Sequence, residues 1–215
     1  IDEPYLRESI LQYINLINDM TNNIDVNERL KIRDLIAESE NNMSSTKLLI
    51  ENFKHVKWHT VRDFWDELLN KLKINFEVIQ TPTDEDIVNT THHAYYKRGF
   101  EASNDYGIYF KTKNNVLLYV WNSTNGEPIY WGIMLKDSSN DFNKEIKLKL
   151  EKNSFPFDVE NDFLHKYFDV NKNEKLVLTD FYKQSTFRII NRKNRSEIID
   201  KLVAEINEYV DKLRL

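Results

Sequence analysis

Residues 106–135, YGIYFKTKNNVLLYVWNSTNGEPIYWGIML, constrain the fold more than any other part of this chain. Apolar and aromatic residues recur there at strand spacing, and the dipeptides Asn114-Asn115 and Asn125-Gly126 interrupt them where tight hairpin turns are expected. The pattern predicts a three-stranded antiparallel meander. Both faces of its strands carry apolar side chains, whereas a sheet with one face in water has polar residues at alternate positions.

Cross-strand pairing divides the side chains of this meander into two faces. If both turns close as two-residue loops, one face is aromatic and contains Tyr106, Ile108, Phe110, Leu117, Tyr119, Trp121, Tyr130 and Met134. The other face contains Tyr109, Lys111, Leu118, Val120, Ile129, Trp131 and Ile133. Two explanations stay open: helices cover both faces, or the aromatic face is a partly open groove for a small ligand or a peptide. In the second case, the groove candidates are Tyr106, Tyr119, Trp121 and Tyr130.

Helical periodicity is found on both sides of the meander in the sequence. Apolar stripes at helical spacing predict helices over residues 2–20, 26–39 and 46–72. The third stripe contains the polar residue Thr60, which suggests a break into two helices. After the meander, Ser196 is expected to cap a last helix with an apolar inner side.

These elements indicate an α+β fold. We expect N-terminal helices packed on the antiparallel meander, with a C-terminal helix completing the structure. A helical region covers residues 1–73 and an α+β sheet domain covers residues 74–215, and the two are expected to form one compact unit. The sequence also predicts a short helix over 160–168 and small strands over 176–178 and 187–190.

Composition excludes several classes of protein. Hydrophobic residues make up 40% and charged residues 30% of the 215 residues, which fits a globular protein. The chain has no cysteine, which excludes disulfides and thiolate metal sites and agrees with a cytoplasmic location. No apolar run approaches the roughly 18 residues of a membrane span. We therefore expect no membrane association. No glycine-rich phosphate-binding loop is present, and we expect no cofactor.

Candidate catalytic residues are few. Asp141, Glu145 and Lys147 come nearest to a metal-dependent nuclease core, but they lie in a charged run with the character of an exposed helix. His55 and His59 have a zinc-compatible spacing of four residues, without a third ligand nearby in the sequence. There is no Gly-x-Ser-x-Gly motif and no cysteine nucleophile. The sequence therefore predicts neither a catalytic residue nor a metal site.

A basic segment near the C-terminus is the candidate nucleic-acid or partner contact. It has no Asp or Glu between residues 181 and 196, although the net charge of the whole chain is -5, and it holds Lys183, Arg188, Arg192, Lys193 and Arg195. Lys and Arg side chains could bind phosphates there, while interleaved aromatic residues stack on bases. The alternative is a solvated loop that leads into the last helix.

The order of three sequence features resembles a known family. The chain resembles the region that follows the nuclease core in certain bacterial proteins of the PD-(D/E)XK nuclease superfamily. The resemblance rests on three features in this order: PYLRESILQYINLINDMTN, FWDELLNKL and the meander. In those proteins the acidic residues and the Glu-x-Lys motif precede the first of these helices. The resemblance implies that such residues lie upstream of Ile1, and that this chain is the trimmed C-terminal accessory part of a metal-dependent nuclease.

The resulting expectation is a non-catalytic recognition or regulatory domain that contacts nucleic acid or another protein. One alternative is a protein-interaction or oligomerisation module built on the long helices at 2–20 and 46–72. Another is a domain that binds a small ligand or a peptide on the aromatic face of the sheet.

Overall fold

The computed structural model of the chain describes residues 26–93, 106–122, 127–135, 144–146, 148–149, 158–160, 163–171, 174–178, 180–181 and 183–215. Its helices are α2 (Val26–Ala37), α3 (Glu40–Leu72), α4 (Asp84–His93), α6 (Gln184–Arg188) and α7 (Arg192–Leu213). The expected α+β class, with an antiparallel sheet and a C-terminal helix, is confirmed. The predicted helix over 2–20 lies outside the described residues.

The fold is built on one antiparallel sheet of six strands. They are β1 (Glu77–Gln80), β2 (Tyr106–Lys111), β3 (Leu117–Asn122), β4 (Tyr130–Met134), β5 (Asp158–Glu160) and β6 (Phe163–Tyr167). Their order across the sheet is β1-β2-β3-β4-β6-β5. A separate two-stranded sheet consists of β7 (Asp169–Asn171) and β8 (Glu174–Lys175). The predicted meander is therefore the centre of a larger sheet.

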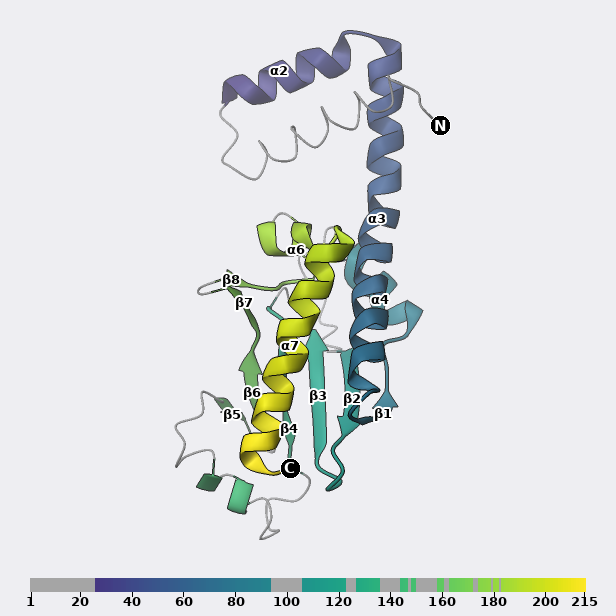
Figure 1. Cartoon of the computed structure of the whole chain (residues 1–215). Helices are drawn as coiled ribbons and strands as arrows, with labels where there is room; N and C mark the ends of the chain where they lie inside the picture. Colours follow the sequence, from purple (N-terminus) through teal and green to yellow (C-terminus); the bar gives the residue numbers. More distant parts are fainter. Residues whose placement is uncertain are drawn as a thin grey trace.

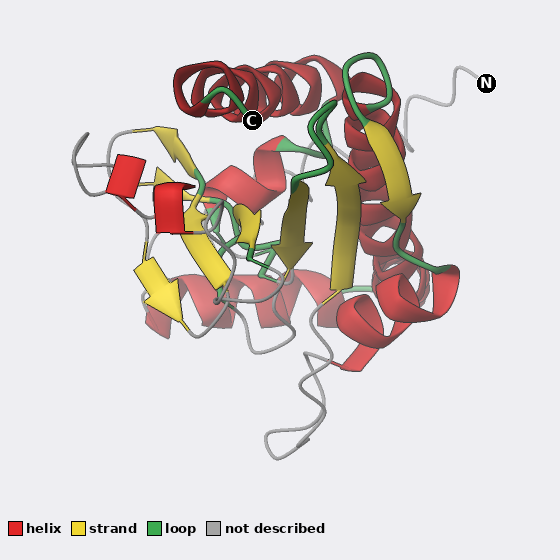
Figure 2. Ribbon diagram, turned by 90° about the horizontal axis from the view of Figure 1, so that it is seen from below, coloured by secondary structure: helices red, strands yellow, loops and turns green. Residues whose placement is uncertain are grey.

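The long helices α3 and α7 pack together on one face of this sheet (Figure 1). Figure 2 shows α7 running along one side of the strands. Helix α3 begins at Ser39, whose hydroxyl accepts a hydrogen bond from the Asn42 backbone N–H at 3.1 Å. The helix is continuous over its 33 residues, so the break predicted at Thr60 is wrong. The Thr60 side chain is buried on the same side of the helix as its apolar residues.

Helix α7 starts four residues before the predicted cap. The side chain of Asn191, not that of Ser196, accepts hydrogen bonds from the backbone N–H groups of Lys193 and Asn194. Asparagine is among the best N-capping residues, so this earlier start is a normal helix beginning. The predicted inner side is confirmed at its most buried positions, which are Ile199, Leu202, Ile206 and Leu213.

A polar contact fixes α7 to the sheet. One carboxylate oxygen of Glu205 accepts hydrogen bonds from the indole N–H of Trp131 at 2.8 Å and from Nζ of Lys166 at 2.9 Å. Trp131 and Lys166 are register partners on β4 and β6, so a single glutamate joins the helix to two strands. Burial lowers the pKa of Lys166, but the hydrogen bond and the charge of Glu205 outweigh burial and raise that pKa above its usual value.

The first hairpin of the meander has a three-residue loop where a two-residue loop is predicted. Thr112 and Val116 are joined by a backbone hydrogen bond of 3.0 Å, and between them Asn115 adopts a φ of 61°. The register therefore pairs Tyr109 with Tyr119, one residue away from the predicted pairing. A one-residue shift moves every side chain of a strand to the other face, so the predicted faces of β2 are wrong.

The predicted faces of β3 and β4 are correct. Trp121 pairs with Tyr130, and Val120 pairs with Trp131, as a two-residue loop at Asn125-Gly126 requires. The loop residues 123–126 themselves lie outside the described residues.

Three other predictions about short elements are wrong. The predicted helix over 160–168 contains strand β6, the predicted strand over 187–190 contains the end of helix α6, and residues 176–178 form no strand. Residues 176–178 are nevertheless buried, and the backbone N–H of Ile129 donates to the carbonyl of Leu176 at 2.7 Å. Burial, not strand pairing, explains their apolar character.

Candidate functional site

Three rows of side chains cross the face of the sheet that lies opposite α3 and α7. Register pairing places Gly107, Trp121, Tyr130 and Tyr167 in one row across β2, β3, β4 and β6. The next row contains Tyr109, Tyr119, Gly132 and His165, and the third contains Lys111, Leu117, Met134 and Phe163. We call the seven ring-bearing residues of this face the aromatic platform: Tyr109, Tyr119, Trp121, Tyr130, Phe163, His165 and Tyr167.

The rings of the aromatic platform contact one another in a continuous series. Ring centroids are 5.2 Å apart for Tyr109 and Trp121, and 4.6 Å apart for Tyr119 and Trp121. From Trp121 the series continues to Tyr130 and then to Tyr167, with 6.0 Å at each step. Most of these pairs have an edge-to-face geometry, which is favourable for aromatic rings.

Two glycines make room for the central rings. A Cβ atom on Gly107 would lie 2.7 Å from Cδ1 of Trp121, and a Cβ atom on Gly132 would lie 2.6 Å from the hydroxyl oxygen of Tyr119. Each ring therefore lies against its glycine register partner on the neighbouring strand.

The two faces of the sheet differ in their exposure. The helix-side residues Ile108, Phe110 and Leu118 are fully buried. On the aromatic platform, every ring except that of Tyr119 is partly exposed. The hydroxyl of Tyr119 donates to the backbone carbonyl of Leu164 at 3.3 Å. The sheet is thus apolar on both sides for two reasons: one face packs on helices, and the other is a half-exposed aromatic surface.

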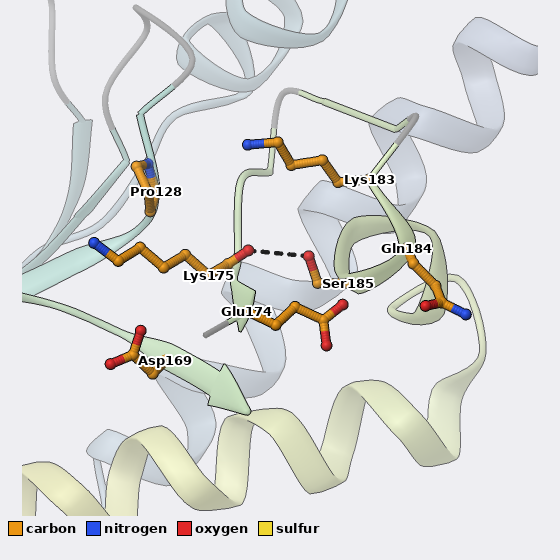
Figure 3. Close-up of a pocket in the computed structure, with 7 residues that line it drawn as sticks. All are labelled: Pro128, Asp169, Glu174, Lys175, Lys183, Gln184 and Ser185. Carbon is orange, nitrogen blue, oxygen red and sulfur yellow. Dashed lines mark hydrogen bonds between the residues drawn. The ribbon is translucent and has the colours of Figure 1, made fainter. Parts of the chain in front are cut away.

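A hollow of about 650 Å³ lies near one end of the first row (Figure 3). It is lined by Pro128, Asp169, Glu174, Lys175, Lys183, Gln184 and Ser185. Its position follows from the chain: Pro128 precedes β4, Asp169 begins β7, and Lys175 ends β8. The hydroxyl of Ser185 donates to the backbone carbonyl of Lys175 at 3.0 Å, which attaches the start of α6 to this edge.

Lys175 connects the hollow to the aromatic platform. Its Nζ lies 4.4 Å from the ring centroid of Tyr167, within the range of a cation–π contact. The hydroxyl of Tyr167 also forms a 3.2 Å hydrogen bond with a carboxylate oxygen of Glu127. The last ring of the row therefore lies between an ammonium group and a carboxylate.

The structure separates the five residues of the predicted basic segment. Lys183 is exposed and lines the hollow. Arg188 forms a 3.6 Å ion pair with Glu174, while Arg192 and Lys193 are exposed in the first turn of α7. These residues do not all share one surface, because Arg195 is buried.

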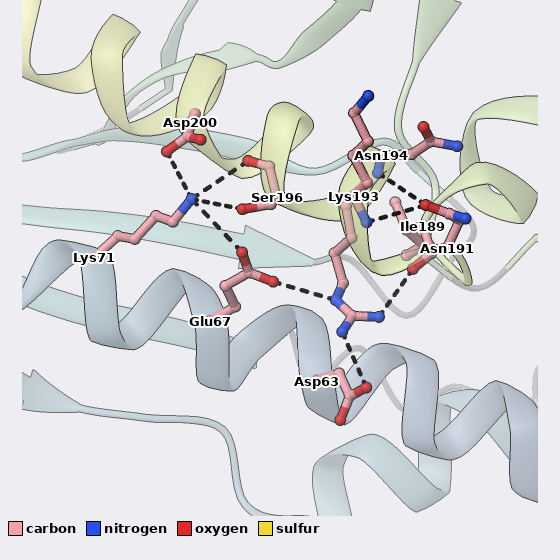
Figure 4. Close-up of polar contacts among 10 residues, drawn as sticks. Asp63, Glu67, Lys71, Ile189, Asn191, Lys193, Asn194, Ser196 and Asp200 are labelled. Carbon is pink, nitrogen blue, oxygen red and sulfur yellow. Dashed lines mark hydrogen bonds and ion pairs between the residues drawn. The ribbon is translucent and has the colours of Figure 1, made fainter.

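Arg195 belongs to a network of charges between α3 and α7 (Figure 4). Its guanidinium forms ion pairs with Asp63 at 3.1 Å and Glu67 at 3.3 Å, and donates to the carbonyl of Ile189 at 3.1 Å. Glu67 also pairs with Lys71 at 3.6 Å. The prediction that Arg195 lies on an exposed basic surface is wrong, because its guanidinium is buried and pairs with carboxylates of α3.

The candidate catalytic residues do not converge in the described part of the chain. No group of three or more His, Asp or Glu residues with metal-binding geometry occurs among the described residues. Glu145 is exposed and pairs with Lys149 at 2.8 Å, one helical turn away. His55 and His59 lie on the exposed side of α3. Asp141 and Lys147 lie outside the described residues.

Three of the four predicted groove residues, Tyr119, Trp121 and Tyr130, lie on the aromatic platform, and Tyr119 is fully buried there. The fourth, Tyr106, is buried on the helix side, where its ring lies 5.7 Å from that of Trp65, because of the register shift in the first hairpin.

Sequence reasoning missed the part of the platform that β6 contributes. Phe163, His165 and Tyr167 alternate at strand spacing, which is the signal that could have identified them. The register error that misplaces Tyr106 also places Tyr109 on the opposite face.

Comparison with known proteins gives no relative: no family model, no curated protein and no solved structure matches the chain. The resemblance to the accessory region of PD-(D/E)XK proteins stays a prediction. None of the helices in the described ranges combines the length and apolar composition that a membrane span requires.

Proposed function

We propose that this chain is a non-catalytic recognition domain that binds single-stranded nucleic acid on the aromatic platform. The observation that carries the proposal is the row of partly exposed rings, Trp121, Tyr130 and Tyr167, which crosses three adjacent strands. An antiparallel sheet that is backed by helices and carries aromatic rings on its other face is a known arrangement for stacking two or three bases of a single strand.

The chemistry of the platform suits bases better than it suits a purely apolar partner. Each base has a π face that stacks on an aromatic ring, and each stack contributes about 1–3 kcal/mol to binding. Tyrosine and histidine also provide polar atoms at the edge of the platform. The exposed ammonium groups of Lys175 and Lys183 lie at the Tyr167 end, where a phosphate of a bound strand would be neutralised.

Fluorescence anisotropy with labelled single strands of about ten nucleotides tests this proposal. We expect binding that weakens as salt rises, and loss of about tenfold in affinity for Trp121→Leu and for Tyr167→Leu. Quenching of tryptophan fluorescence should accompany binding and disappear in Trp121→Leu. Retained affinity in both variants, with both folded, would exclude the platform as the binding surface.

Two control variants test whether a loss of affinity is specific to the aromatic platform and its neighbouring lysines. Tyr209→Leu removes a partly exposed ring that packs against Trp131 on the helix side, and should leave affinity unchanged. Lys73→Ala removes an exposed charge near the end of α3, and should weaken binding less than Lys175→Ala or Lys183→Ala. Circular dichroism spectra establish that each variant is folded.

The proposal includes the role that the family resemblance implies, namely a domain that acts beside a metal-dependent nuclease core. With Mg²⁺ or Mn²⁺ present, this chain should bind a labelled single strand and leave it intact. Cleavage that is lost on changing Glu145 or Lys147 would contradict the non-catalytic role.

Protein interaction is a second candidate function, favoured by the exposed apolar side chains of α2 and the first half of α3. Leu48 is 60% exposed and Ile50 is 64% exposed, and Leu30, Leu35 and Met43 are also exposed. Sedimentation analysis of Leu48→Glu and Ile50→Glu would test it. If these residues form an interface, both changes shift the protein towards monomer, whereas Ile74→Glu, at an exposed position after α3, does not.

A further inference from the structure

The hollow beside Tyr167 has a chemistry that differs from the rest of the aromatic platform. Asp169 and Lys175 are register partners on β7 and β8, so the two-stranded sheet places their side chains side by side. Both line the hollow, and Lys183 approaches the same space from the start of α6 (Figure 3). The hollow therefore combines two ammonium groups, of Lys175 and Lys183, with two carboxylates, of Asp169 and Glu174.

Asp169 is the carboxylate that is open to a ligand. Glu174, the other acid of the hollow, accepts a hydrogen bond from the Asn171 side chain at 2.8 Å and lies 3.6 Å from Arg188. Asp169 is exposed, and its charge acts on the Lys166 ammonium strongly enough to help raise the pKa of that group.

We propose that this hollow receives one base of the bound strand and selects guanine. The inference rests on the proposed binding of single-stranded nucleic acid to the platform. A volume of about 650 Å³ falls within the range of small-molecule sites, which is about 300–1,000 Å³. The base enters past the Tyr167 ring, at the end of the row of stacked bases.

The selection follows from the order of donors and acceptors on the base edge. Guanine presents an acceptor, O6, followed by the donors N1–H and N2–H₂. An ammonium group of Lys175 or Lys183 donates to O6, and the Asp169 carboxylate accepts from the two N–H groups. Uracil and cytosine present an acceptor where guanine has N2–H₂, and adenine lacks an acceptor at the position of O6. Each of these bases would place an unsatisfied or repulsive group against the Asp169–Lys175 pair.

Competition binding with short strands of uridines, about five nucleotides long, tests the inference. In one set of strands the 5′ nucleotide is guanosine, adenosine, cytidine or uridine, and in a second set the 3′ nucleotide is varied in the same way. In one of the two sets, we expect the strand that ends in guanosine to bind the wild-type protein about tenfold more tightly than the strand that ends in uridine. Asp169→Asn should reduce that ratio to about twofold or less, and Lys183→Ala should lower affinity for all strands. Asp211→Asn removes the same charge from an exposed position near the end of α7 and should preserve the ratio.

The outcomes separate this inference from the proposed function. If strands bind and Trp121→Leu weakens them, but all end bases bind equally at both ends, the hollow is not a base-selective site and the platform remains the binding surface. A guanine preference that survives in Asp169→Asn also overturns the inference. If no strand binds at low salt, the proposed function fails and this inference fails with it.

Discussion

Arg192 and Arg195 stand three residues apart on α7, yet only one of them contributes to the core. Arg192 is exposed, whereas Arg195 is 7% exposed and pairs with carboxylates of α3. The sequence presents both as basic residues of one segment. What distinguishes them is the direction of each side chain on the helix and the presence of Asp63 and Glu67 on a helix more than a hundred residues earlier in the chain.

Replacing Arg195 with methionine should therefore lower the free energy of unfolding by about 2–4 kcal/mol, because it leaves the Ile189 carbonyl without its donor and removes the ion pairs with Asp63 and Glu67. Arg192→Met, at an exposed position, should change it by less than about 0.5 kcal/mol. Urea denaturation of the two variants measures the difference. Equal losses would contradict the assignment of Arg195 to the packed interface.

Glu67 makes the stability of this interface depend on pH. Burial raises the pKa of its carboxyl, but hydrogen bonds from Ser196 and Arg195 and the charges of Lys71 and Arg195 outweigh burial and hold the pKa below its ordinary value of 4.5. Because the folded pKa is the lower one, the ionised carboxylate stabilises the folded state. This contribution is complete above the ordinary pKa and is lost as the pH falls through the folded value.

We therefore expect Glu67→Gln to be less stable than the wild type at neutral pH and to lose less stability between about pH 5 and pH 3. Unfolding free energies from urea titrations across this range give the comparison. Glu77→Gln, on an exposed strand position, serves as the control and should follow the wild-type pH dependence. Parallel curves for Glu67→Gln and the wild type would show that Glu67 does not contribute.

At the scale of single elements, two hairpins of the same meander show where a turn signal is sufficient. Asn125-Gly126 favours a two-residue turn, and the observed pairing of β3 with β4 agrees with it. Asn114-Asn115 allows two readings, because either residue tolerates positive φ. The chain uses the longer loop, in which Asn115 alone is left-handed, and this moves Tyr109 onto the platform.

The loop conformation at Asn115 gives a sharp test of the first hairpin. Glycine adopts a φ of 61° without strain, so Asn115→Gly should leave stability unchanged or raise it slightly. Asn115→Val should lower it by about 1–2 kcal/mol, since a β-branched residue is strained in this region. Thermal unfolding of both variants measures the effect. If valine is tolerated as well as glycine, the loop does not use a left-handed residue at this position.

At the scale of the whole molecule, periodicity predicts the layers of the fold but not the surface that they create. The stripes of α3 and α7 identify helices correctly because each buries one side on the sheet. The sequence pattern of strand β6 also fits a helix, because Phe163, Leu164, Tyr167 and Phe168 are apolar at helical spacing. Both faces of β6 contribute to packing: Leu164 lies in the core, and Phe163 and Tyr167 lie on the platform. The hollow is formed by segments distant in sequence, which no local pattern can bring together.

The two halves of α3 should differ in their local stability. Val61, Phe64, Leu68 and Leu72 are fully buried. The first part of the helix, next to α2, projects beyond the sheet (Figure 1), and none of residues 42–52 is buried. Local opening costs least where few apolar contacts must be broken. In hydrogen exchange followed by mass spectrometry, peptides from residues 61–72 should therefore exchange at least about a hundredfold more slowly than peptides from residues 42–52. Equal protection of both halves would mean that the projecting part is covered in solution. Dilution would then identify the cover, because an interface between copies of the chain loses protection as concentration falls and an internal contact does not.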